Sequence, residues 1–229
     1  MMVNKTAIVF GATGLTGSAL VNELIQNMRY TAVKVFARRD LDLEHIKVIE
    51  HIVNIEKPGE YSDIIKGDDL FICLGTTMRK AGSVKRMEEI DRDLPLAIAK
   101  AALLNGVRNI AVVSSIGANP SSRNYYSRIK GELEQSILAM QFKRKVIVRP
   151  SVLLGKRSEI RILESMGKAL VQAFGFLLTG KNKKYRGIKA AVVAKAMVRA
   201  INESNGKEIY ESDELVELSA KTKEPGSVS

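Results

Sequence analysis

The sequence has little cysteine, little aromatic content and no long apolar segment. Its single cysteine, Cys73, excludes an intramolecular disulfide, and this usage favours a reducing compartment such as the cytosol. No stretch approaches the roughly 18 consecutive apolar residues of a transmembrane helix, so we expect no membrane span. The first apolar run, residues 7–10, is followed at once by glycine and is too short for a signal peptide. Together these absences predict a cytoplasmic protein.

Positive charge is in excess, with 36 Lys and Arg residues against 25 Asp and Glu residues, a formal net charge of +11. Such an excess fits nucleic acid, an anionic membrane surface or an anionic cofactor. The densest basic stretches, residues 143–149 and 181–189, have no helix-turn-helix pattern, zinc-ligand spacing or interleaved aromatic residues. We therefore expect a small-molecule substrate and no specific nucleic-acid partner.

Short apolar runs alternate along the chain with longer segments in which apolar residues recur at helical spacing. Strands separated by helices require crossover connections, and hence a parallel sheet. The strands are continuous apolar runs, as expected where helices cover both faces of a sheet. The sequence predicts an α/β fold with a doubly wound, mainly parallel sheet. The expected strands are residues 6–12, 32–38, 46–54, 68–75, 108–115 and 145–155, and the expected helices are residues 15–28, 88–106, 125–140 and 190–203.

A chain of 229 residues is long enough for one domain with a hydrophobic core. We expect this domain at residues 1–220 and a flexible tail at residues 221–229. Residues 155–190 break the alternation of strands and helices, and we expect a small C-terminal lobe there, on the substrate side. Its apolar segment, residues 169–180, could roof a pocket or lie on a membrane surface, and we favour the roof.

Three glycines follow the first strand with the spacing G-x-x-G-x-x-G and open the first helix. In a dinucleotide site the first glycine permits a tight turn, the second lets the backbone approach a pyrophosphate, and the third lets helix and strand pack closely. The helix N-terminus then offers free N–H groups and a positive dipole end to the phosphates. We predict cofactor contacts from the turn residues Gly11, Thr13, Gly14, Leu15, Thr16 and Gly17.

The second predicted strand ends in two arginines. A carboxylate at this position would bind the ribose of NAD, but Arg38 and Arg39 suit a 2′-phosphate and favour NADP. Asp40 follows directly and could still serve NAD. We therefore expect NADP as the cofactor, with NAD as the less favoured alternative.

Several segments, taken with the glycine turn, resemble one group of proteins: CLGTTMRKAG (73–82), DRD (91–93), SSIGA (114–118), YSRIKGELE (126–134) and RPSVLLGKRSEIR (149–161). They are similar to the atypical short-chain dehydrogenase/reductases, NAD(P)-binding proteins with a Rossmann fold, and in particular to relatives of the Tat-interacting oxidoreductase-like protein. The resemblance covers about residues 5–205 and implies an NADP-dependent oxidoreductase acting on a small carbonyl or hydroxyl compound. The alternative is an NADP(H)-binding regulatory or redox-sensing protein with little or no turnover.

The resemblance also implies a Ser-Tyr-Lys catalytic set. Tyr126 lies four residues before Lys130, so both share one helix face, whereas Tyr125 points about 100° away. Tyr126 would exchange a proton with the substrate oxygen, and Lys130 would bind the nicotinamide ribose and favour the ionised tyrosine. Ser115 would hydrogen-bond the same oxygen, with Ser114 as the near alternative. Only ten residues separate Ser115 from Tyr126, which leaves little room for substrate-binding structure, so the chemistry could be weak or lost.

By position in this family, further cofactor contacts are expected at the carboxyl ends of the other strands. They are Asn54 near the adenine, Leu74, Gly75 and Thr76 beside the adenosine ribose, and Pro150, Ser151 and Val152 near the nicotinamide amide. Asp91 lies where the superfamily often has a polar residue, but a solvated helix charge explains it equally well. Substrate-side candidates are Met78, Arg79, Lys80, Arg157 and Arg161.

The remaining reactive side chains have no expected function. His45 and His51 do not have the spacing of metal ligands, so no metal site is predicted. Cys73 lies in an apolar strand and is expected to be a buried thiol. The helix that carries Tyr126 could pair with a second copy of itself, so a homodimer or another protein partner is possible.

Overall fold

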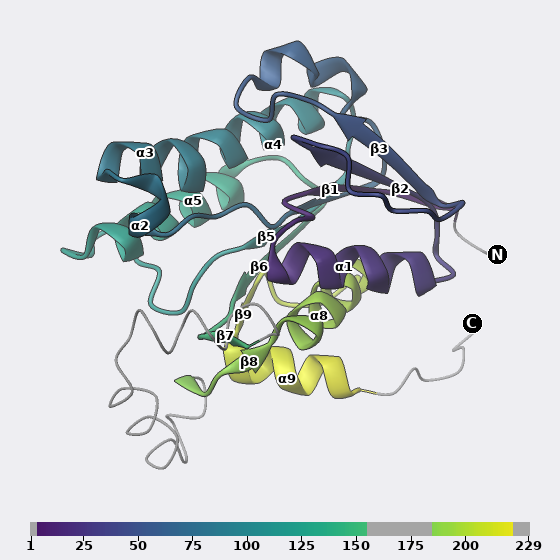
Figure 1. Ribbon diagram of the computed structural model, residues 1–229. Helices are drawn as coiled ribbons and strands as arrows, with labels where there is room; N and C mark the ends of the chain where they lie inside the picture. Colours follow the sequence, from purple (N-terminus) through teal and green to yellow (C-terminus); the bar gives the residue numbers. More distant parts are fainter. Residues whose placement is uncertain (1–3, 155–184, 222–229) are drawn as a thin grey trace.

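The protein is built around one parallel sheet, seen in a computed structural model that describes residues 4–154 and 185–221 (Figure 1). Seven strands lie in the order β3-β2-β1-β4-β5-β6-β9, and each neighbouring pair is parallel. This contains the 3-2-1-4-5-6 order of dinucleotide-binding folds, in which ligands bind at the carboxyl ends of the strands. The strands are β1 (Lys5–Phe10), β2 (Tyr30–Ala37), β3 (Val48–Ile52), β4 (Asp69–Ile72), β5 (Asn109–Val113), β6 (Arg144–Arg149) and β9 (Ile209–Glu211).

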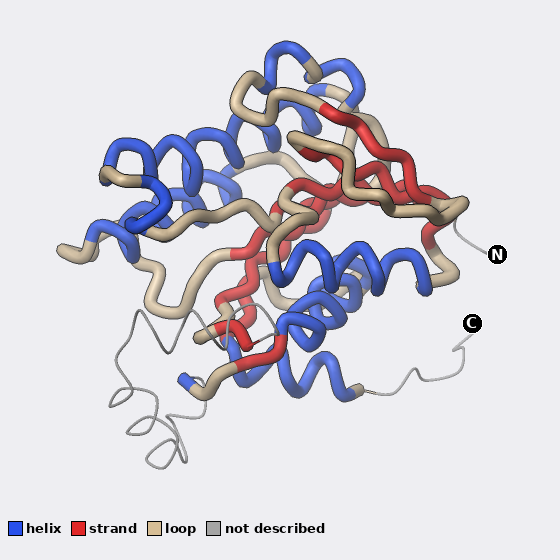
Figure 2. Tube along the Cα trace, in the orientation of Figure 1, coloured by secondary structure: helices blue, strands red, loops and turns tan. Residues whose placement is uncertain are grey.

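Helices cover both faces of the sheet (Figure 2). One face carries α1 (Leu15–Gln26), α8 (Ala190–Asn202) and α9 (Ser212–Ala220), and the other carries α4 (Leu94–Leu104) and α5 (Tyr125–Ala139). The prediction of a doubly wound parallel sheet is therefore confirmed. Shorter elements are the helices α2 (Met78–Ala81) and α3 (Val84–Glu88), the 3₁₀ turns η1 (Pro58–Glu60) and η2 (Ser62–Ile64), the π-helical turn η3 (Glu89–Asp93), and a parallel pair of β7 (Leu153–Leu154) with β8 (Ile188–Lys189).

Alternate residues of the central strand β1 supply two separate hydrophobic cores. Ala7 and Val9 pack into the core under α1, α8 and α9, whereas Ile8 and Phe10 pack into the core under α4 and α5. Because successive side chains of a strand point to opposite faces, a strand covered on both sides must be apolar throughout. This explains why the strands read in the sequence as continuous apolar runs.

Two predicted elements differ from the structure by about six residues at one end, more than the others do. The strand expected at residues 145–155 ends at Arg149, because Pro150 has no N–H group to continue the ladder. The helix expected at residues 88–106 begins with the π-helical turn η3, and α4 starts after it with Pro95 near its N-terminus. Residues 155–184 of the expected lobe, and residues 222–229 of the expected tail, lie outside the described residues.

Candidate functional site

The glycine turn between β1 and α1 has no room for larger residues at two of its positions. Gly11 has φ +88°, and a Cβ added there would lie 2.5 Å from the carbonyl oxygen of Cys73, at the end of β4. A Cβ added at Gly17 would lie 2.1 Å from the carbonyl oxygen of Gly11. The glycines thus let β1, β4 and the first turn of α1 approach closely, which brings the start of α1 to the carboxyl edge of the sheet.

The N-terminus of α1 is open. Gly14 is the N-cap residue, and its N–H donates to the carbonyl of Gly11 at 3.0 Å, which closes the turn. Glycine has no side chain to accept from the first-turn N–H groups of Leu15, Thr16 and Gly17, which have no partner within a helix. Together with the positive end of the helix dipole, these donors suit a phosphate.

A cleft of about 790 Å³ lies beside this turn. It joins the turn to the ends of β2 and β4, which is where a dinucleotide lies in folds of this order. Residues predicted as cofactor contacts line it, together with Lys80 of α2 and Arg86 of α3. The lining includes Gly11, Thr13, Gly14, Arg38, Arg39, Glu56, Leu74, Gly75, Thr76, Lys80 and Arg86. The residues present therefore fit a bound dinucleotide.

The end of β2 presents cations to this cleft. Arg38 and Arg39 are both exposed and both line it. The carboxylate of Asp40 accepts instead from the backbone N–H of Asp42 at 2.8 Å, within its own loop, where Asp42 has a positive φ of 52°. The charge that this strand end offers to a ligand is therefore mainly positive.

Helix α5 orients Tyr126 and Lys130 on one face, as the spacing predicted. Asn124 caps the helix, its side-chain oxygen accepting from the N–H of Ser127 at 3.1 Å. Tyr126 is half-buried in the first turn, and Lys130 lies one turn further on and is only 3 % exposed. Among the described residues, no side-chain hydrogen bond holds the Tyr126 hydroxyl, so it is available to a ligand.

Lys130 forms a buried ion pair with Asp91. Its Nζ lies 2.8 Å from Oδ1 of Asp91, whose side chain is 1 % exposed, although the direction of approach is not that of a hydrogen bond. The other carboxylate oxygen accepts from the backbone N–H of Thr76 at 2.9 Å. A Cβ added at Gly75 would lie 3.3 Å from Oδ1 of Asp91 and 3.9 Å from Nζ of Lys130. The lysine of α5 thus reaches the end of β4, at the edge of the cleft.

The sequence left Asp91 open between a site residue and a solvated helix charge, and the structure excludes the solvated charge. Asp91 sits in the π-helical turn η3, which turns its carboxylate inward onto Lys130 and the end of β4. Such turns inside helices are frequent at functional sites. A lone aspartate in a charged stretch carries no signal of this geometry in the sequence.

The two serines after β5 have different surroundings. The hydroxyl of Ser114 is buried and donates to Glu134 at 2.5 Å, and Glu134 in turn accepts from Nε of Arg149 at 2.9 Å. Ser115 is partly buried, and its hydroxyl has only a weak contact of 3.4 Å with the carbonyl of its neighbour Ile116. Of the two serines, Ser115 is therefore the one with a hydroxyl free for a ligand.

The short loop from Ser115 to Tyr126 is packed against α5. The N–H of Asn119 donates to the carbonyl of Ser127 at 2.9 Å, and a Cβ added at Gly131 would lie 2.2 Å from the nitrogen of Pro120. The N–H of Ile116 also donates to the carbonyl of Pro150 at 3.1 Å. These contacts fix the ends of β5 and β6 and the start of α5 relative to one another.

Several predicted contacts do not line the cleft. Asn54 accepts from the N–H of Glu56 at 3.2 Å, and its neighbours Ile55 and Glu56 line the cleft. Ser151 donates to the carbonyl of Arg186 and accepts from Ser212 at 3.1 Å, on the β6 side. The cofactor contacts proposed at Asn54, Pro150, Ser151 and Val152 therefore stay predictions.

Of the substrate-side candidates that the structure describes, only Lys80 lines the cleft, as does Arg86. Arg157, Arg161 and the segment 169–180 lie outside the described residues. Cys73, expected to be a buried thiol, is partly buried: the residue lines the cleft but also packs against the core, and this desolvation raises the pKa of its thiol to about 12. Sequence reasoning missed Glu56 and Arg86, because charges in surface turns and short helices have no distinctive pattern.

Comparison with known proteins agrees with this geometry. A family model described as NAD(P)H-binding matches residues 11–204. A short-chain dehydrogenase/reductase superfamily protein from Agrobacterium tumefaciens, solved with bound NAD, has a TM-score of 0.65 and 15% identity, covering 93% of this chain and 81% of that chain. The chain therefore has the Rossmann fold of that structure, and it belongs to the NAD(P)H-binding family.

Two curated relatives show which members of the family the chain is similar to. The chain is 34% identical over 204 residues to "Protein FMP52, mitochondrial" of Candida glabrata, covering 83% of this chain and 87% of the relative. It is 37% identical over 164 residues to "Protein HTATIP2" of Rattus norvegicus, covering 70% of this chain and 67% of the relative. Within the family the chain resembles HTATIP2, as the sequence motifs indicated.

The expected cytoplasmic location is wrong on this comparison. Several fungal relatives, at 31% to 39% identity, have the word mitochondrial in their names. The single cysteine and the lack of a long apolar run excluded a disulfide and a membrane span, but neither observation distinguishes one reducing compartment from another. Within residues 4–154 and 185–221, no helix is long and apolar enough to cross a membrane, and no cluster of three potential ligands could hold a metal.

Proposed function

We propose that the protein is an NADP-dependent oxidoreductase that acts on a small carbonyl or hydroxyl compound through Ser115, Tyr126 and Lys130. The observation that carries the proposal is the position of Lys130, whose Nζ lies at the end of β4 beside Gly75, a residue that lines the cleft. This links the helix of the tyrosine directly to the dinucleotide cleft. The first turn of α1 would hold the pyrophosphate.

Each of the three side chains has a separate role in the reaction. When bound, the reduced cofactor supplies the hydride. The hydroxyl of Tyr126 gives its proton to the carbonyl oxygen as that oxygen becomes a hydroxyl, and the hydroxyl of Ser115 donates a hydrogen bond to the same oxygen. The ammonium of Lys130 stabilises the resulting tyrosinate and binds the ribose.

The preference for NADP over NAD rests on the end of β2. Arg38 and Arg39 line the cleft and are free to bind a 2′-phosphate, for which a guanidinium is well suited. Asp40, the residue that could serve NAD, already accepts a hydrogen bond within its own loop. NADPH should therefore bind more tightly than NADH.

The test is a screen of aldehydes, ketones and alcohols for NADPH oxidation or NADP reduction, repeated with Tyr126→Phe. On a verified substrate this change should lower turnover at least about 100-fold, because general acid catalysis is lost, and leave NADPH affinity unchanged. Tyr125→Phe is the matched control and should keep full turnover. Unchanged turnover in Tyr126→Phe would contradict the mechanism.

A second function, an NADP(H)-binding regulatory or redox-sensing protein with little turnover, is favoured by one observation. Asp91 pairs with Lys130 at 2.8 Å in a buried position, so part of the positive charge that would act on Tyr126 is neutralised. This function predicts NADPH binding with no cofactor oxidation above the background of Tyr126→Phe across the whole screen. Any substrate turned over well above that background would exclude it.

The names of the fungal relatives also support a mitochondrial location. Fractionation of cells that express the tagged full-length chain tests this location, with co-sedimentation with mitochondria as the expected result. A homodimer through α5, or a complex with another protein, is a further prediction, and light scattering of the purified chain would distinguish a monomer from a dimer.

A further inference from the structure

Arg86, on the short helix α3, brings a further guanidinium to the dinucleotide cleft. It lines the cleft together with Arg38, which comes from the end of β2. The guanidinium of Arg86 binds two carboxylates, one nitrogen donating to Glu89 at 2.9 Å and another forming an ion pair with Glu56. Glu89 is on the following turn of the same helical segment, whereas Glu56 follows β3. The pair of Arg86 with Glu56 therefore connects two walls of the cleft.

Glu56 stands out among the residues of this cleft. Of the described residues that line it, Glu56 alone carries a carboxylate, beside the cations Arg38, Arg39, Lys80 and Arg86. The hydrogen bond from Arg86 lowers the pKa of Glu56, and the nearby charge of Arg38 lowers it further. The carboxylate of Glu56 is thus paired with the guanidinium of Arg86 and lies near the charge of Arg38, which follows β2. The arrangement marks a position at which the protein favours an anion.

We propose that Arg86 is a specificity-determining residue for NADP, at which the 2′-phosphate of the cofactor replaces Glu56 as the partner of the guanidinium. Arg38 holds the same phosphate from the β2 side. This inference rests on the proposed dinucleotide function and adds to it a residue from a different wall of the cleft. Glu56 acts in the opposite sense, because its carboxylate competes with the phosphate for both arginines.

The exchange is favourable because the ion pair that must break is weak. The side chains of Arg86 and Glu56 are 39% and 44% exposed, and ion pairs at such exposure contribute little to stability. A phosphate monoester carries a charge of about −1.5 to −2 and three acceptor oxygens, so it can bind two guanidinium groups together. NADH has a hydroxyl at this position and gives no reason for Glu56 to leave Arg86.

The inference is tested by calorimetric titration of NADPH and NADH into the full chain and two variants. Arg86→Gln should weaken NADPH binding about tenfold and NADH binding less than about twofold, since only the contact with the 2′-phosphate is lost. Glu56→Gln should tighten NADPH binding severalfold and leave NADH binding unchanged. Lys85→Gln, at the exposed residue before Arg86, and Glu60→Gln, at an exposed residue of η1, are matched controls and should change neither.

The outcomes separate this inference from the proposed function. If Arg86→Gln weakens the binding of NADPH and NADH equally, Arg86 has only a structural role in the cleft, and the inference is overturned. Weaker NADPH binding in Glu56→Gln would overturn it too. Tight NADPH binding that neither variant alters would remove the inference and keep the proposed function, whereas a folded wild-type chain that binds neither cofactor would remove both. If Arg86→Gln does not fold, Glu56→Gln alone decides the question.

Discussion

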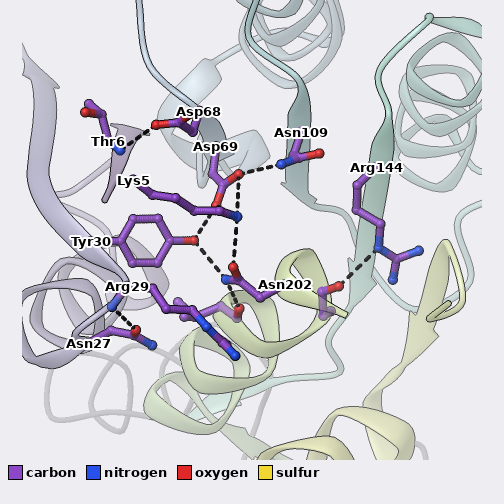
Figure 3. A network of polar contacts seen from close by, with 12 residues as sticks. Lys5, Thr6, Asn27, Arg29, Tyr30, Asp68, Asp69, Asn109, Arg144 and Asn202 are labelled. Carbon is purple, nitrogen blue, oxygen red and sulfur yellow. Dashed lines mark hydrogen bonds and ion pairs between the residues drawn. The ribbon is translucent and has the colours of Figure 1, made fainter. Parts of the chain in front are cut away.

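The two ends of the parallel sheet each contain a buried aspartate paired with a lysine, and the two pairs differ in what surrounds them. At the amino end, Nζ of Lys5 lies 2.9 Å from Asp69, which is fully buried (Figure 3). Asp69 also accepts from the hydroxyl of Tyr30 at 2.5 Å and from the amide of Asn109 at 2.7 Å. Asn202 donates to the Tyr30 hydroxyl at 3.0 Å, which connects α8 to the hydrogen-bond network of Asp69.

At the carboxyl end, the pair of Asp91 and Lys130 has a similar separation, 2.8 Å, but fewer partners. Asp91 accepts one hydrogen bond, from the N–H of Thr76, and its other oxygen faces Lys130 without hydrogen-bond geometry. The cleft that Gly75 lines at this end of the sheet also includes the turn before α1 and the exposed Arg38 and Arg39.

The two ends differ in how many of their polar groups have hydrogen-bond partners within the protein, and this difference distinguishes a stabilising network from a binding site. Buried polar groups normally have hydrogen-bond partners within the protein, and the Asp69 network follows that rule. Burial and the neighbouring Asp69 raise the pKa of Tyr30 far above its usual range, so its hydroxyl keeps its proton as a donor. At the carboxyl end, the N–H groups at the start of α1 and the side chains of Arg38 and Arg39 can bind a ligand. Changes at the amino end should therefore affect stability alone, whereas changes at the carboxyl end should also affect binding.

The largest expected loss of stability follows Asp69→Ala. This change leaves Lys5, Tyr30 and Asn109 without their shared acceptor and should lower the free energy of unfolding by roughly 4 kcal/mol or more. Urea denaturation measures this, with Asp63→Ala, at an exposed position, as the control within about 0.5 kcal/mol of wild type. At a temperature where the variant is folded, NADPH affinity should equal that of wild type. A large loss of affinity there would break the proposed division between the two ends.

Lys130→Met should reduce both stability and binding. It leaves the carboxylate of Asp91 buried with one remaining donor, at a cost of about 3 kcal/mol, and removes the cation from the edge of the cleft. Adding Asp91→Asn should restore most of the stability, because the uncompensated charge is gone, but not the cofactor affinity. Parallel urea unfolding and NADPH titration of the single and double variants measure the two effects. Recovery of NADPH affinity in the double variant would show that Lys130 is only structural.

Gly17→Ala should destabilise the chain by about 2 kcal/mol and also weaken cofactor binding. The added Cβ would lie 2.1 Å from the carbonyl oxygen of Gly11, so the turn and the start of α1 must move apart. Gly59→Ala is the matched control, because a Cβ there meets nothing within 4 Å. Thermal unfolding with and without NADPH measures both effects. A Gly17→Ala variant with wild-type stability and affinity would contradict the close packing of the turn.

The smallest expected effect is the pH dependence contributed by His51. Burial, followed by the charge of Lys34, lowers the pKa of His51 from its usual value of 6.5, so the folded state binds this proton less readily than the unfolded state. Its contribution to stability is therefore fully present above about pH 6.5 and is lost as the pH falls through the lower pKa of the folded state. Urea unfolding from pH 7.5 to 5.5 should show a loss below about 1 kcal/mol that is absent in His51→Phe. An equal loss in both proteins would assign it to other groups.

The glycine turn, the strands and the parallel sheet could be predicted because each rests on local spacing. The spacing of Gly11, Gly14 and Gly17 alone marks the turn. The strands between Lys5 and Arg149 are apolar runs, because both faces of the sheet are covered by helices. The short strand β9 and the helix α9 that follows it were not predicted. The three residues of β9, at the sheet edge, form no apolar run that would mark a strand.

The polar pairs could not be predicted, since they join distant parts of the chain. Asp91 meets Lys130 from a π-helical turn about 40 residues earlier in the chain, and both side chains lie close to Gly75. In the same way, Glu56 meets Arg86 across the cleft from separate elements. Such contacts depend on helix orientation, which apolar periodicity does not specify.

The central claim is that the carboxyl end of the sheet is an NADP(H) site, and calorimetric titration of the folded chain with NADPH and NADH in parallel tests it most directly. The account predicts binding of one molecule per chain, with NADPH clearly tighter than NADH, because Arg38, Arg39 and Arg86 meet the 2′-phosphate. Tighter binding of NADH would contradict the assignment of these arginines, and no binding of either cofactor would contradict the site itself.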